Sequence, residues 1–320
     1  MKVLITGGAG FIGSHLVDEF MERGDNVTVI DDLSSGSLNN LKQWIDNLRF
    51  KFLKADLKTA ENWIKEFESI DCVLHFAANP EVKVSIIEPK VHFNENLLTT
   101  FNVLEACKHF KIPYLIFAST STVYGDANKI PTPEDYAPLK PISVYGAIKL
   151  SCEILVETYS RLYGIRSLIL RYANIVGPRS RHGVIIDFIN KLRSNKKVLE
   201  ILGDGSQKKS YLYIDDAVKA TIKAMEWMFS SDKLIEIFNI GNEDWISVKE
   251  VADIIVRSLG LNDVKYVYKP ATYDGRGWPG DVKRMLLDIT KITTMVGWRP
   301  KLNSQKAIEM TVRGLIERGI

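Results

Sequence analysis

Short runs of apolar, mostly β-branched residues alternate with longer amphipathic segments through the first half of this chain. Such runs are typical of strands buried on both faces of a parallel sheet, and the amphipathic segments between them supply the connecting helices. The pattern therefore predicts an α/β fold built on a doubly wound parallel sheet. The expected strands are Lys2–Thr6, Asn26–Ile30, Phe50–Lys54, Cys72–Phe76, Tyr114–Ser119 and Arg166–Arg171.

The longest expected helix covers Val144–Tyr163, and its apolar residues recur at spacings of three and four. That spacing predicts one buried stripe, with Tyr145 and Lys149 beside it at the edge of a cleft. The predicted stripe is Val144, Ile148, Cys152, Leu155, Tyr159 and Leu162. The other helices expected in the first half are His15–Arg23, Leu38–Asn47, Ala60–Phe67 and Val91–Phe110.

The alternation weakens after Tyr172. We therefore expect a first domain over residues 1–172 and a smaller lobe, mainly substrate-binding, over 173–320. Segments near 211–245 are expected to return to the first domain. The elements expected in this half are a helix over Val184–Ser194, a strand over Ile235–Ile240, and helices over Val248–Leu259 and Ser304–Arg318, with a turn-rich stretch at Asp274–Gly280.

A glycine-rich turn follows the first expected strand, where Thr6–Gly13 reads TGGAGFIG. Gly7 permits the tight turn, Gly10 lets the backbone approach a pyrophosphate, and Gly13 allows the helix to pack closely on the strand. Free amides and the positive end of the helix dipole then attract the phosphates. At the start of a βαβ unit this motif predicts a dinucleotide site and a Rossmann-like fold.

Asp31 ends the second expected strand, eighteen residues after Gly13. A carboxylate at this place accepts hydrogen bonds from the adenosine ribose and repels a 2′-phosphate, so we expect NAD in preference to NADP. A solvated loop acid is the alternative for Asp31. The further cofactor contacts that we expect are Phe11, Ile12, Asp32, Leu33, Ser34, Ser35, Gly36, Asp56, Leu57, Phe76, Ala77, Ala78, Asn96 and Ser119.

Tyr145 and Lys149 are four residues apart, so they share a face of their helix. An ordinary tyrosine, with a pKa of about 10, is a poor base at neutral pH. A nearby cation lowers that pKa, and such a phenol can take a proton from an alcohol while hydride leaves for a nicotinamide. By itself the spacing is weak, because a tyrosine and a lysine four residues apart more often mark only a solvated helix face.

Several motifs together resemble the extended short-chain dehydrogenase/reductase family. Within that family the chain is similar to the UDP-glucose 4-epimerases, particularly the shorter archaeal type, through essentially its whole length. The residues that carry the resemblance are Thr6–Gly13, Asp31, Thr120 with Val123-Tyr124-Gly125, the Tyr145/Lys149 pair and Arg171-Tyr172-Ala173-Asn174.

The resemblance implies an NAD-dependent isomerase acting at C4 of a UDP-hexose, interconverting UDP-glucose and UDP-galactose. Tyr145 would be the base toward the 4-hydroxyl, and Lys149 would hold the nicotinamide ribose and lower the tyrosine pKa. Thr120 would bond the same sugar oxygen, although neighbouring Ser119 and Ser121 leave this assignment open by one position. NAD would stay bound while hydride leaves the sugar and returns to its opposite face. A homodimer through the helices near Val91–Phe110 and Val144–Tyr163 is also implied.

On the substrate side, the resemblance places Asn174 and Arg276 on the diphosphate and Asp281 on a ribose. Lys209 stands where many relatives have an arginine, and the spacing from Arg276 to Asp281 is two residues longer than in common bacterial relatives, so these diphosphate contacts are less secure than the catalytic pair. The remaining expected substrate contacts are Val184, Leu199 and Leu202 around the uracil, and Tyr211.

The sugar itself stays open. Met285 falls near the position that gates the C2 substituent, and methionine is flexible, so glucose-type and N-acetylglucosamine-type sugars both fit. A C6 carboxylate, as in UDP-glucuronate, also fits. Nucleotide-sugar dehydratases and decarboxylases of the family need carboxylates after the active-site threonine, where this chain has Ser121-Thr122. A non-catalytic NAD-binding protein would generally lack the tyrosine–lysine pair.

Composition narrows the classes of partner. The 320 residues carry 42 basic and 39 acidic side chains, a net charge of +3. This balance gives no reason to expect nucleic acid or a membrane surface as a partner. The scattered Cys72, Cys107 and Cys152 have no metal-ligand spacing and suit a reducing compartment. Met1–Thr6 runs directly into glycines without a basic leader, so we expect a cytoplasmic location. We also expect no metal.

Overall fold

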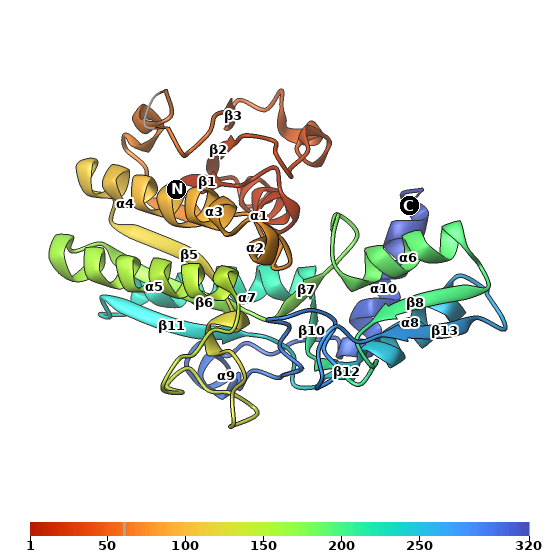
Figure 1. The fold of residues 1–320 in the computed structure, drawn as a ribbon. Coiled ribbons are helices and arrows are strands. Elements are labelled where there is room, and N and C mark those ends of the chain that lie inside the picture. Colours follow the sequence, from red (N-terminus) through yellow and green to blue (C-terminus); the bar gives the residue numbers. More distant parts are fainter. Residues whose placement is uncertain (60–61, 320) are drawn as a thin grey trace. The chain divides into compact units, whose positions relative to one another are not determined.

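The computed structural model describes residues 1–59 and 62–319 (Figure 1). Its contacts divide the chain into two compact units, each made of three separate segments of sequence. Unit 1 contains Met1–Val123, Val144–Arg171 and Thr221–Phe238, and unit 2 contains Tyr124–Ser143, Tyr172–Ala220 and Asn239–Ile320.

Unit 1 is built on a seven-stranded sheet with the strand order β11-β6-β5-β4-β1-β2-β3. The order reverses beside β1, which is the arrangement of a doubly wound sheet. The strands β1, β2, β3, β4 and β5 all pair in parallel, so the predicted fold class is confirmed. The strands are β1 (Lys2–Thr6), β2 (Asn26–Asp31), β3 (Phe50–Lys54), β4 (Cys72–His75), β5 (Tyr114–Thr120), β6 (Arg166–Tyr172) and β11 (Ile235–Ile240).

Two of the helices expected in unit 1 are largely replaced by short 3₁₀ turns. Leu38–Asn47 forms only the short 3₁₀ turns Leu38–Asn40 and Lys42–Trp44. Of the expected helix Ala60–Phe67, a 3₁₀ turn over Ile64–Phe67 is present, and residues 60–61 lie outside the described residues. The longer helices are α1 (Phe11–Glu22), α4 (Thr99–His109) and α5 (Val144–Tyr163), with α2 (Val84–Ile87) and α3 (Pro89–His92) before α4.

The segment expected as one helix over Val91–Phe110 is divided. A π-helical stretch over Phe93–Leu98 separates α3 from α4. Such stretches are rare and often occur at functional sites. Here the π-helical segment includes the buried side chain of Asn96.

The buried face of α5 is rotated relative to the predicted stripe. Val144 and Leu162 are exposed, at 39% and 67%, whereas Lys149 and Glu153 are almost fully buried. Cys152 lies on the buried face, as expected. The periodicity missed this face because two of its members are charged, and their burial depends on partners from the sheet.

Helices α4 and α5 lie side by side along the sheet (Figure 1), and the core of unit 1 fills the space between them and the strands. Close packing of this layer holds the ends of β4, β5 and β6 in fixed register with α5. Its central members are Val73, Leu104, Phe117, Val156 and Ile169. All three cysteines, Cys72, Cys107 and Cys152, are buried.

Unit 2 is a set of small sheets packed with helices. The pairs β7–β10 and β8–β13 are parallel, and β9 lies between β12 and β14. Helix α8 begins with a capping box in which Ser247 and Glu250 bond each other's backbone amides. The strands are β7 (Asn174–Val176), β8 (Val198–Leu202), β9 (Lys208–Lys209), β10 (Tyr211–Tyr213), β12 (Ile246–Ser247), β13 (Lys265–Lys269) and β14 (Arg284–Met285). The helices are α6 (Val184–Ser194), α8 (Val248–Ser258), α9 (Thr290–Val296) and α10 (Ser304–Glu317), and α7 (Ile214–Ser230) passes from unit 2 into unit 1.

Among residues 1–59 and 62–319, none of the helices has the length and apolar character that crossing a membrane requires.

Candidate active site

The glycine turn has the geometry that a pyrophosphate cradle requires. Gly7 has a φ of +70°, and a Cβ there would lie 2.6 Å from the Ala77 amide nitrogen. A Cβ at Gly13 would lie 2.2 Å from the Gly7 carbonyl oxygen, so only glycine lets α1 approach the turn. Gly10 is the N-cap of α1 and no side chain caps the helix. The first amides of α1, at Phe11 and Ile12, are therefore donors with no partner inside the helix, which fits a phosphate group.

Asp31 ends β2 beside this turn. Its Oδ2 accepts from the Ala9 amide at 2.9 Å and its Oδ1 from the Leu33 amide at 2.8 Å. Burial raises the pKa of this carboxyl, and the two amides partly offset the effect. Each carboxylate oxygen keeps a second lone pair, so Asp31 can still accept from ribose hydroxyls. Asp32 is exposed and accepts from the Ser34 amide at 2.8 Å, holding the turn Leu33–Gly36.

Two other predicted cofactor segments lie at the same edge of the sheet. The Phe76 amide donates to the Thr6 carbonyl, and Gly7 packs against the Phe76–Ala77 peptide. The Ala55 amide donates to the Asp31 carbonyl, which places Asp56 next to the end of β2. These segments can therefore line one dinucleotide. Leu57 follows as a core residue, 5% exposed.

Asn96 supports this edge through its neighbours. Its Oδ1 accepts from the Asn79 amide at 2.7 Å, and its Nδ2 donates to the Asn79 carbonyl at 3.1 Å and to His92 Nδ1 at 3.0 Å. The side chain is 1% exposed. Its amide therefore holds the loop after β4 in place, and a direct contact to the cofactor stays a prediction.

Tyr145 and Thr120 are hydrogen-bonded partners at the start of α5 and the end of β5. The neighbouring Ser119 hydroxyl donates instead to Glu153. This difference favours Thr120 among the adjacent hydroxyls for the role beside the tyrosine. The ring of His92 packs edge-on against Tyr145, with ring centroids 5.4 Å apart.

The pKa shifts of Tyr145 and Lys149 differ from the expectation. Burial raises the pKa of Tyr145 to about 12, and the Thr120 hydrogen bond offsets only part of this. The Lys149 ammonium lies over the Phe117 ring, 4.3 Å from its centroid, and burial lowers the pKa of Lys149. Lys149 is not among the groups that shift the pKa of Tyr145 in this structure, so the expected lowering by Lys149 is not seen here.

Two residues that the sequence analysis did not single out, His75 and Glu153, lie near Lys149. His75 bonds Thr6 Oγ1 at 2.7 Å and Thr100 Oγ1 at 3.0 Å, and burial lowers its pKa to about 3. Glu153, one further turn of α5 beyond Lys149, pairs with Arg171, Nη2 to Oε2 2.7 Å. Extending the i, i+4 spacing once more along α5 points to Glu153, whereas nothing local to His75 marks it.

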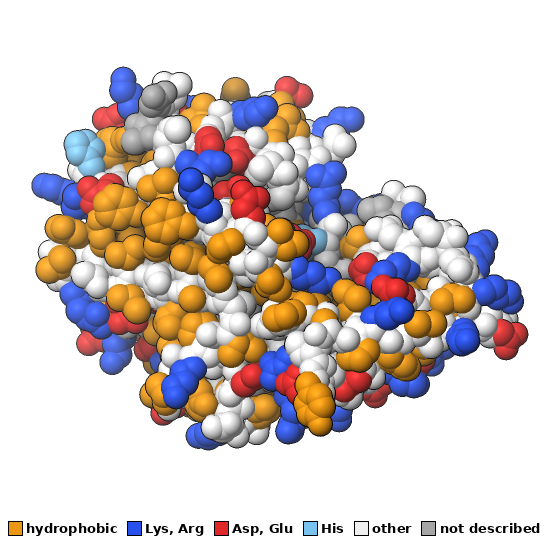
Figure 2. Space-filling model, in the orientation of Figure 1, with side chains coloured by type: hydrophobic (Ala, Val, Ile, Leu, Met, Phe, Trp, Pro, Cys, Tyr) orange, Lys and Arg blue, Asp and Glu red, His pale blue; other side chains and the backbone are white. Residues whose placement is uncertain are grey.

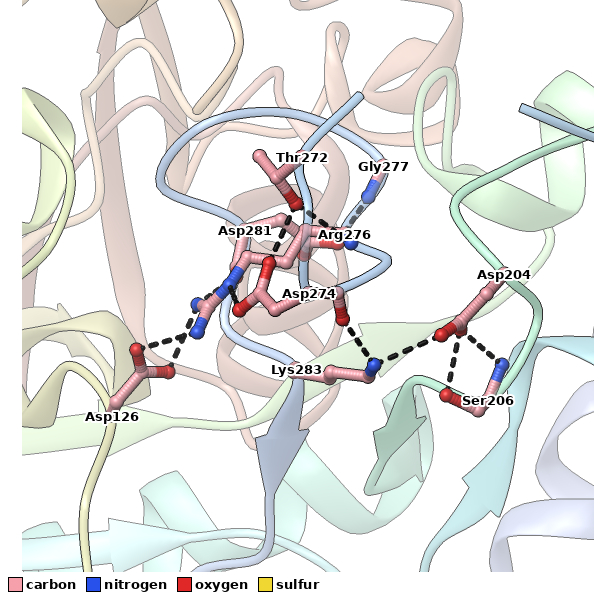
Figure 3. A network of polar contacts seen from close by, with 9 residues as sticks. All are labelled: Asp126, Asp204, Ser206, Thr272, Asp274, Arg276, Gly277, Asp281 and Lys283. Atoms are coloured by element: carbon pink, nitrogen blue, oxygen red, sulfur yellow. Dashed lines mark hydrogen bonds and ion pairs between the residues drawn. The ribbon is translucent and has the colours of Figure 1, made fainter. Parts of the chain in front are cut away.

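Arg276 and Asp281 belong to a connected network of polar contacts within unit 2 (Figure 3). Arg276 donates to Asp126 from Nη1 and Nη2, at 3.1 and 2.9 Å, and from Nε to Asp274 at 2.6 Å. Lys209 Nζ lies 2.5 Å from Asp281 Oδ1. The Asp281 side chain is 2% exposed, so it anchors Lys209 here and offers little surface to a ribose.

The other predicted substrate residues are distributed over unit 2. Asn174 donates to the Ser210 carbonyl at 3.0 Å, and Tyr211, next in the chain, is 3% exposed. Leu202 ends β8 and Val184 begins α6, both part-buried. Leu199 is fully buried in β8, and its contact to a uracil stays a prediction. Met285 pairs with Lys209 in the β14–β9 ladder.

The described residues contain no cluster of His, Cys, Asp or Glu that could hold a metal ion.

Comparisons with known proteins match this arrangement. The family model described as "NAD dependent epimerase/dehydratase family" matches residues 3–241. A "Putative UDP-glucose 4-epimerase" of Methanocaldococcus jannaschii is 36% identical over 97% of each chain. A "UDP-glucuronate 4-epimerase" of Thermodesulfobacterium geofontis is 32% identical, over 97% of this chain and 94% of the relative. A crystal structure of a UDP-galactose 4-epimerase superposes with a TM-score of 0.88 at 46% identity, covering 99% of both chains.

Proposed function

Because this chain belongs to the NAD-dependent epimerase/dehydratase family, we propose that it is an epimerase that inverts C4 of a UDP-hexose, interconverting UDP-glucose and UDP-galactose. Its cofactor is NAD, and its relatives support an enzyme of the UDP-sugar 4-epimerase type without identifying the sugar. The single observation that carries the proposal is the contact between Thr120 and Tyr145, with Lys149 one turn further along α5.

The glycine turn and Asp31 form the proposed cofactor cradle. Gly7 and Gly13 leave the room that a Cβ would fill, and the uncapped start of α1 turns its amides to the pyrophosphate. Asp31 takes the adenosine ribose and disfavours a 2′-phosphate. Bound NAD supplies a hydride acceptor and a fixed positive charge beside the sugar.

The protein's own contribution is to hold and move one proton. Tyr145 takes the proton from the sugar 4-hydroxyl as that carbon is oxidised, and returns it when the carbon is reduced on its other face. Burial raises the pKa of the phenol to about 12 in this structure, and a positive charge placed beside it would lower that pKa toward the range in which it can act as a base. Thr120 orients the phenol oxygen, and the buried Lys149 supplies a cation on the same helix face.

In the same proposal, Arg276 and Lys209 bind the diphosphate and Asn174 contacts it. Two cations and a donor amide match phosphate chemistry, with the guanidinium able to bind two oxygens at once. Met285 lies directly opposite Lys209 in the β14–β9 ladder, which supports its assignment to the sugar-proximal part of the site.

We also propose a homodimer in the cytoplasm, formed through α4 and α5. Figure 2 shows hydrophobic side chains gathered over these helices. Contiguous exposed apolar surface of this kind is typical of protein interfaces. Sedimentation at micromolar concentration should show a dimer, and Phe101→Glu should make it monomeric while Ile316→Glu, an exposed apolar residue of α10, should not. The most exposed members are Phe93, Phe101, Ile154, Leu162 and Tyr163.

A panel of UDP-sugars tests the proposed reaction. The purified holoenzyme is incubated with UDP-glucose, UDP-galactose, UDP-N-acetylglucosamine and UDP-glucuronate, and products are separated by chromatography while NADH absorbance is followed. Epimerised hexose without stoichiometric NADH supports the proposal. NADH released in proportion to product would identify a dehydrogenase, and epimerisation only of the N-acetyl or glucuronate sugar would replace the proposed substrate.

A further inference from the structure

The guanidinium of Arg276 is almost saturated by protein acceptors (Figure 3). Nε donates to Asp274, Nη2 to Asp126, and Nη1 to both Asp126 and the Asp281 carbonyl, at 2.6 to 3.1 Å. Arginine has five N–H donors, and four of them have acceptors among residues 1–59 and 62–319, which leaves one N–H of Nη2. The edge formed by Nη1 and Nη2, which binds two phosphate oxygens side by side, is held by the two oxygens of Asp126.

The net charge around Arg276 also opposes the binding of a diphosphate. In the network of Figure 3 extended to Lys209, three cations (Lys209, Arg276, Lys283) face four carboxylates (Asp126, Asp204, Asp274, Asp281). The surplus is one negative charge, which repels an incoming diphosphate. The pKa of Arg276 is raised, with the Asp126 hydrogen bonds as the largest cause, so this pair is the dominant interaction of the guanidinium.

Asp126 is placed so that its side chain can be displaced while its backbone stays fixed. The carboxylate side chain is 44% exposed and Arg276 is 18% exposed. Exposed ion pairs contribute little net stability and exchange readily. The backbone before it is anchored, because a Cβ at Gly125 would lie 1.8 Å from the Lys140 carbonyl oxygen. The Arg276 loop is docked on the same segment, where Gly280 packs against the Ile142 carbonyl.

We propose that Asp126 is an internal competitor of the substrate diphosphate: its carboxylate occupies the bidentate edge of Arg276 and must release it when a UDP-sugar binds. The proposal rests on the function proposed above, in which Arg276 binds the diphosphate. Asp126 lies six residues after Thr120 in the chain and nineteen before Tyr145, on the segment that joins the two catalytic elements. When Asp126 releases Arg276, the segment between Thr120 and Tyr145 therefore loses one of its contacts. Asp126 sets the affinity for the nucleotide part of the substrate without touching the reacting carbon.

Calorimetric titration of the holoenzyme with UDP tests this role. For Asp126→Asn the dissociation constant of UDP should fall by about threefold to tenfold. This is the change expected if Asp126 holds Arg276 in most molecules of the natural protein, so that only about a tenth to a third of them can bind UDP. The matched control is Asp204→Asn, which removes an aspartate of the same network that pairs with Lys283 and not with Arg276. Uridine, which has no diphosphate, should bind both variants and the natural protein equally.

The outcomes separate the two proposals. If Arg276→Ala does not weaken UDP binding, Arg276 is not the diphosphate ligand and the assignment of the substrate site fails. If Arg276→Ala weakens binding but Asp126→Asn leaves it unchanged or weaker, only the competitor role is overturned. Equal tightening by Asp126→Asn and Asp204→Asn would indicate general charge removal, and tighter uridine binding would indicate a structural change; both results reject the competitor role. Thermal melts of each variant establish that it is folded.

Discussion

Glu153 and Arg171 form a buried ion pair that connects α5 to β6, with Arg171 Nη2 2.7 Å from Glu153 Oε2 and both side chains at most 4% exposed. Arg171 Nε also donates to Glu153 Oε1 at 3.0 Å, so the pair is bidentate. Glu153 accepts from Ser119 as well, beside Thr120. The pair therefore fixes the ends of β5 and β6 relative to the helix that carries Tyr145 and Lys149.

Breaking this pair should destabilise the protein strongly. Glu153→Gln removes the carboxylate that pairs with the buried Arg171, and breaking such a buried pair typically costs about 3–5 kcal/mol of unfolding free energy. Chemical denaturation measures this loss, and the double variant Glu153→Gln/Arg171→Gln should recover part of it. Glu157→Gln is the control, since Glu157 pairs with the exposed Arg161 on the same helix and its loss should cost less than about 1 kcal/mol. Equal losses in both single variants would contradict the argument.

Tyr145→Phe should lower turnover by about two to four orders of magnitude, the usual scale for a lost general base. NAD binding should be nearly unchanged, since the phenol oxygen is not part of the glycine cradle. Initial rates of UDP-hexose epimerisation and the NAD content of the purified protein measure the two effects. Tyr163→Phe, at an exposed position of the same helix, is the control. Comparable rates for Tyr145→Phe and the natural protein would remove Tyr145 from the mechanism.

Acid should destabilise the protein through His75. Because its pKa is about 3 in the folded state against an ordinary 6.5, the unfolded chain binds a proton that the folded one does not. The contribution of His75 to the free energy of unfolding is therefore fully present above pH 6.5. It falls as the pH decreases from 6.5 toward 3, by about 1.4 kcal/mol per pH unit. Denaturation series between pH 7 and 4 should show a shallower dependence for His75→Gln. The exposed His109→Gln should keep the natural slope, and an identical slope for His75→Gln would show that another group is responsible.

Asp31→Ala should weaken NAD binding and relax the discrimination against NADP. The carboxylate supplies the negative charge that disfavours a 2′-phosphate, and its removal also frees the Ala9 and Leu33 amides that it now accepts from. Fluorescence titration with both dinucleotides after cofactor removal measures the ratio of dissociation constants. Asp46→Asn, an exposed aspartate, serves as the control. An unchanged ratio for Asp31→Ala would contradict the role of this carboxylate.

The sequence by itself determined the strands of the large sheet, the glycine cradle and the Tyr145/Lys149 spacing. These features depend on local patterns: buried parallel strands read as continuous apolar runs, a positive φ requires glycine at Gly7, and helical periodicity puts residues i and i+4 on one face. The expected strands Lys2–Thr6 and Phe50–Lys54 and helix Val144–Tyr163 agree with the structure to the residue for this reason.

Only the tertiary structure decided which charged groups are buried and with whom. The partner of Glu153 is on a neighbouring strand, and Arg276 meets Asp126 across 150 residues of sequence. The pKa of Tyr145 likewise depends on burial by groups that are remote in the chain, which is why the expected lowering by Lys149 is replaced by a raised value. Periodicity carries no information on such pairings, because desolvation and ion-pair energies are set by distances between residues that the fold alone brings together.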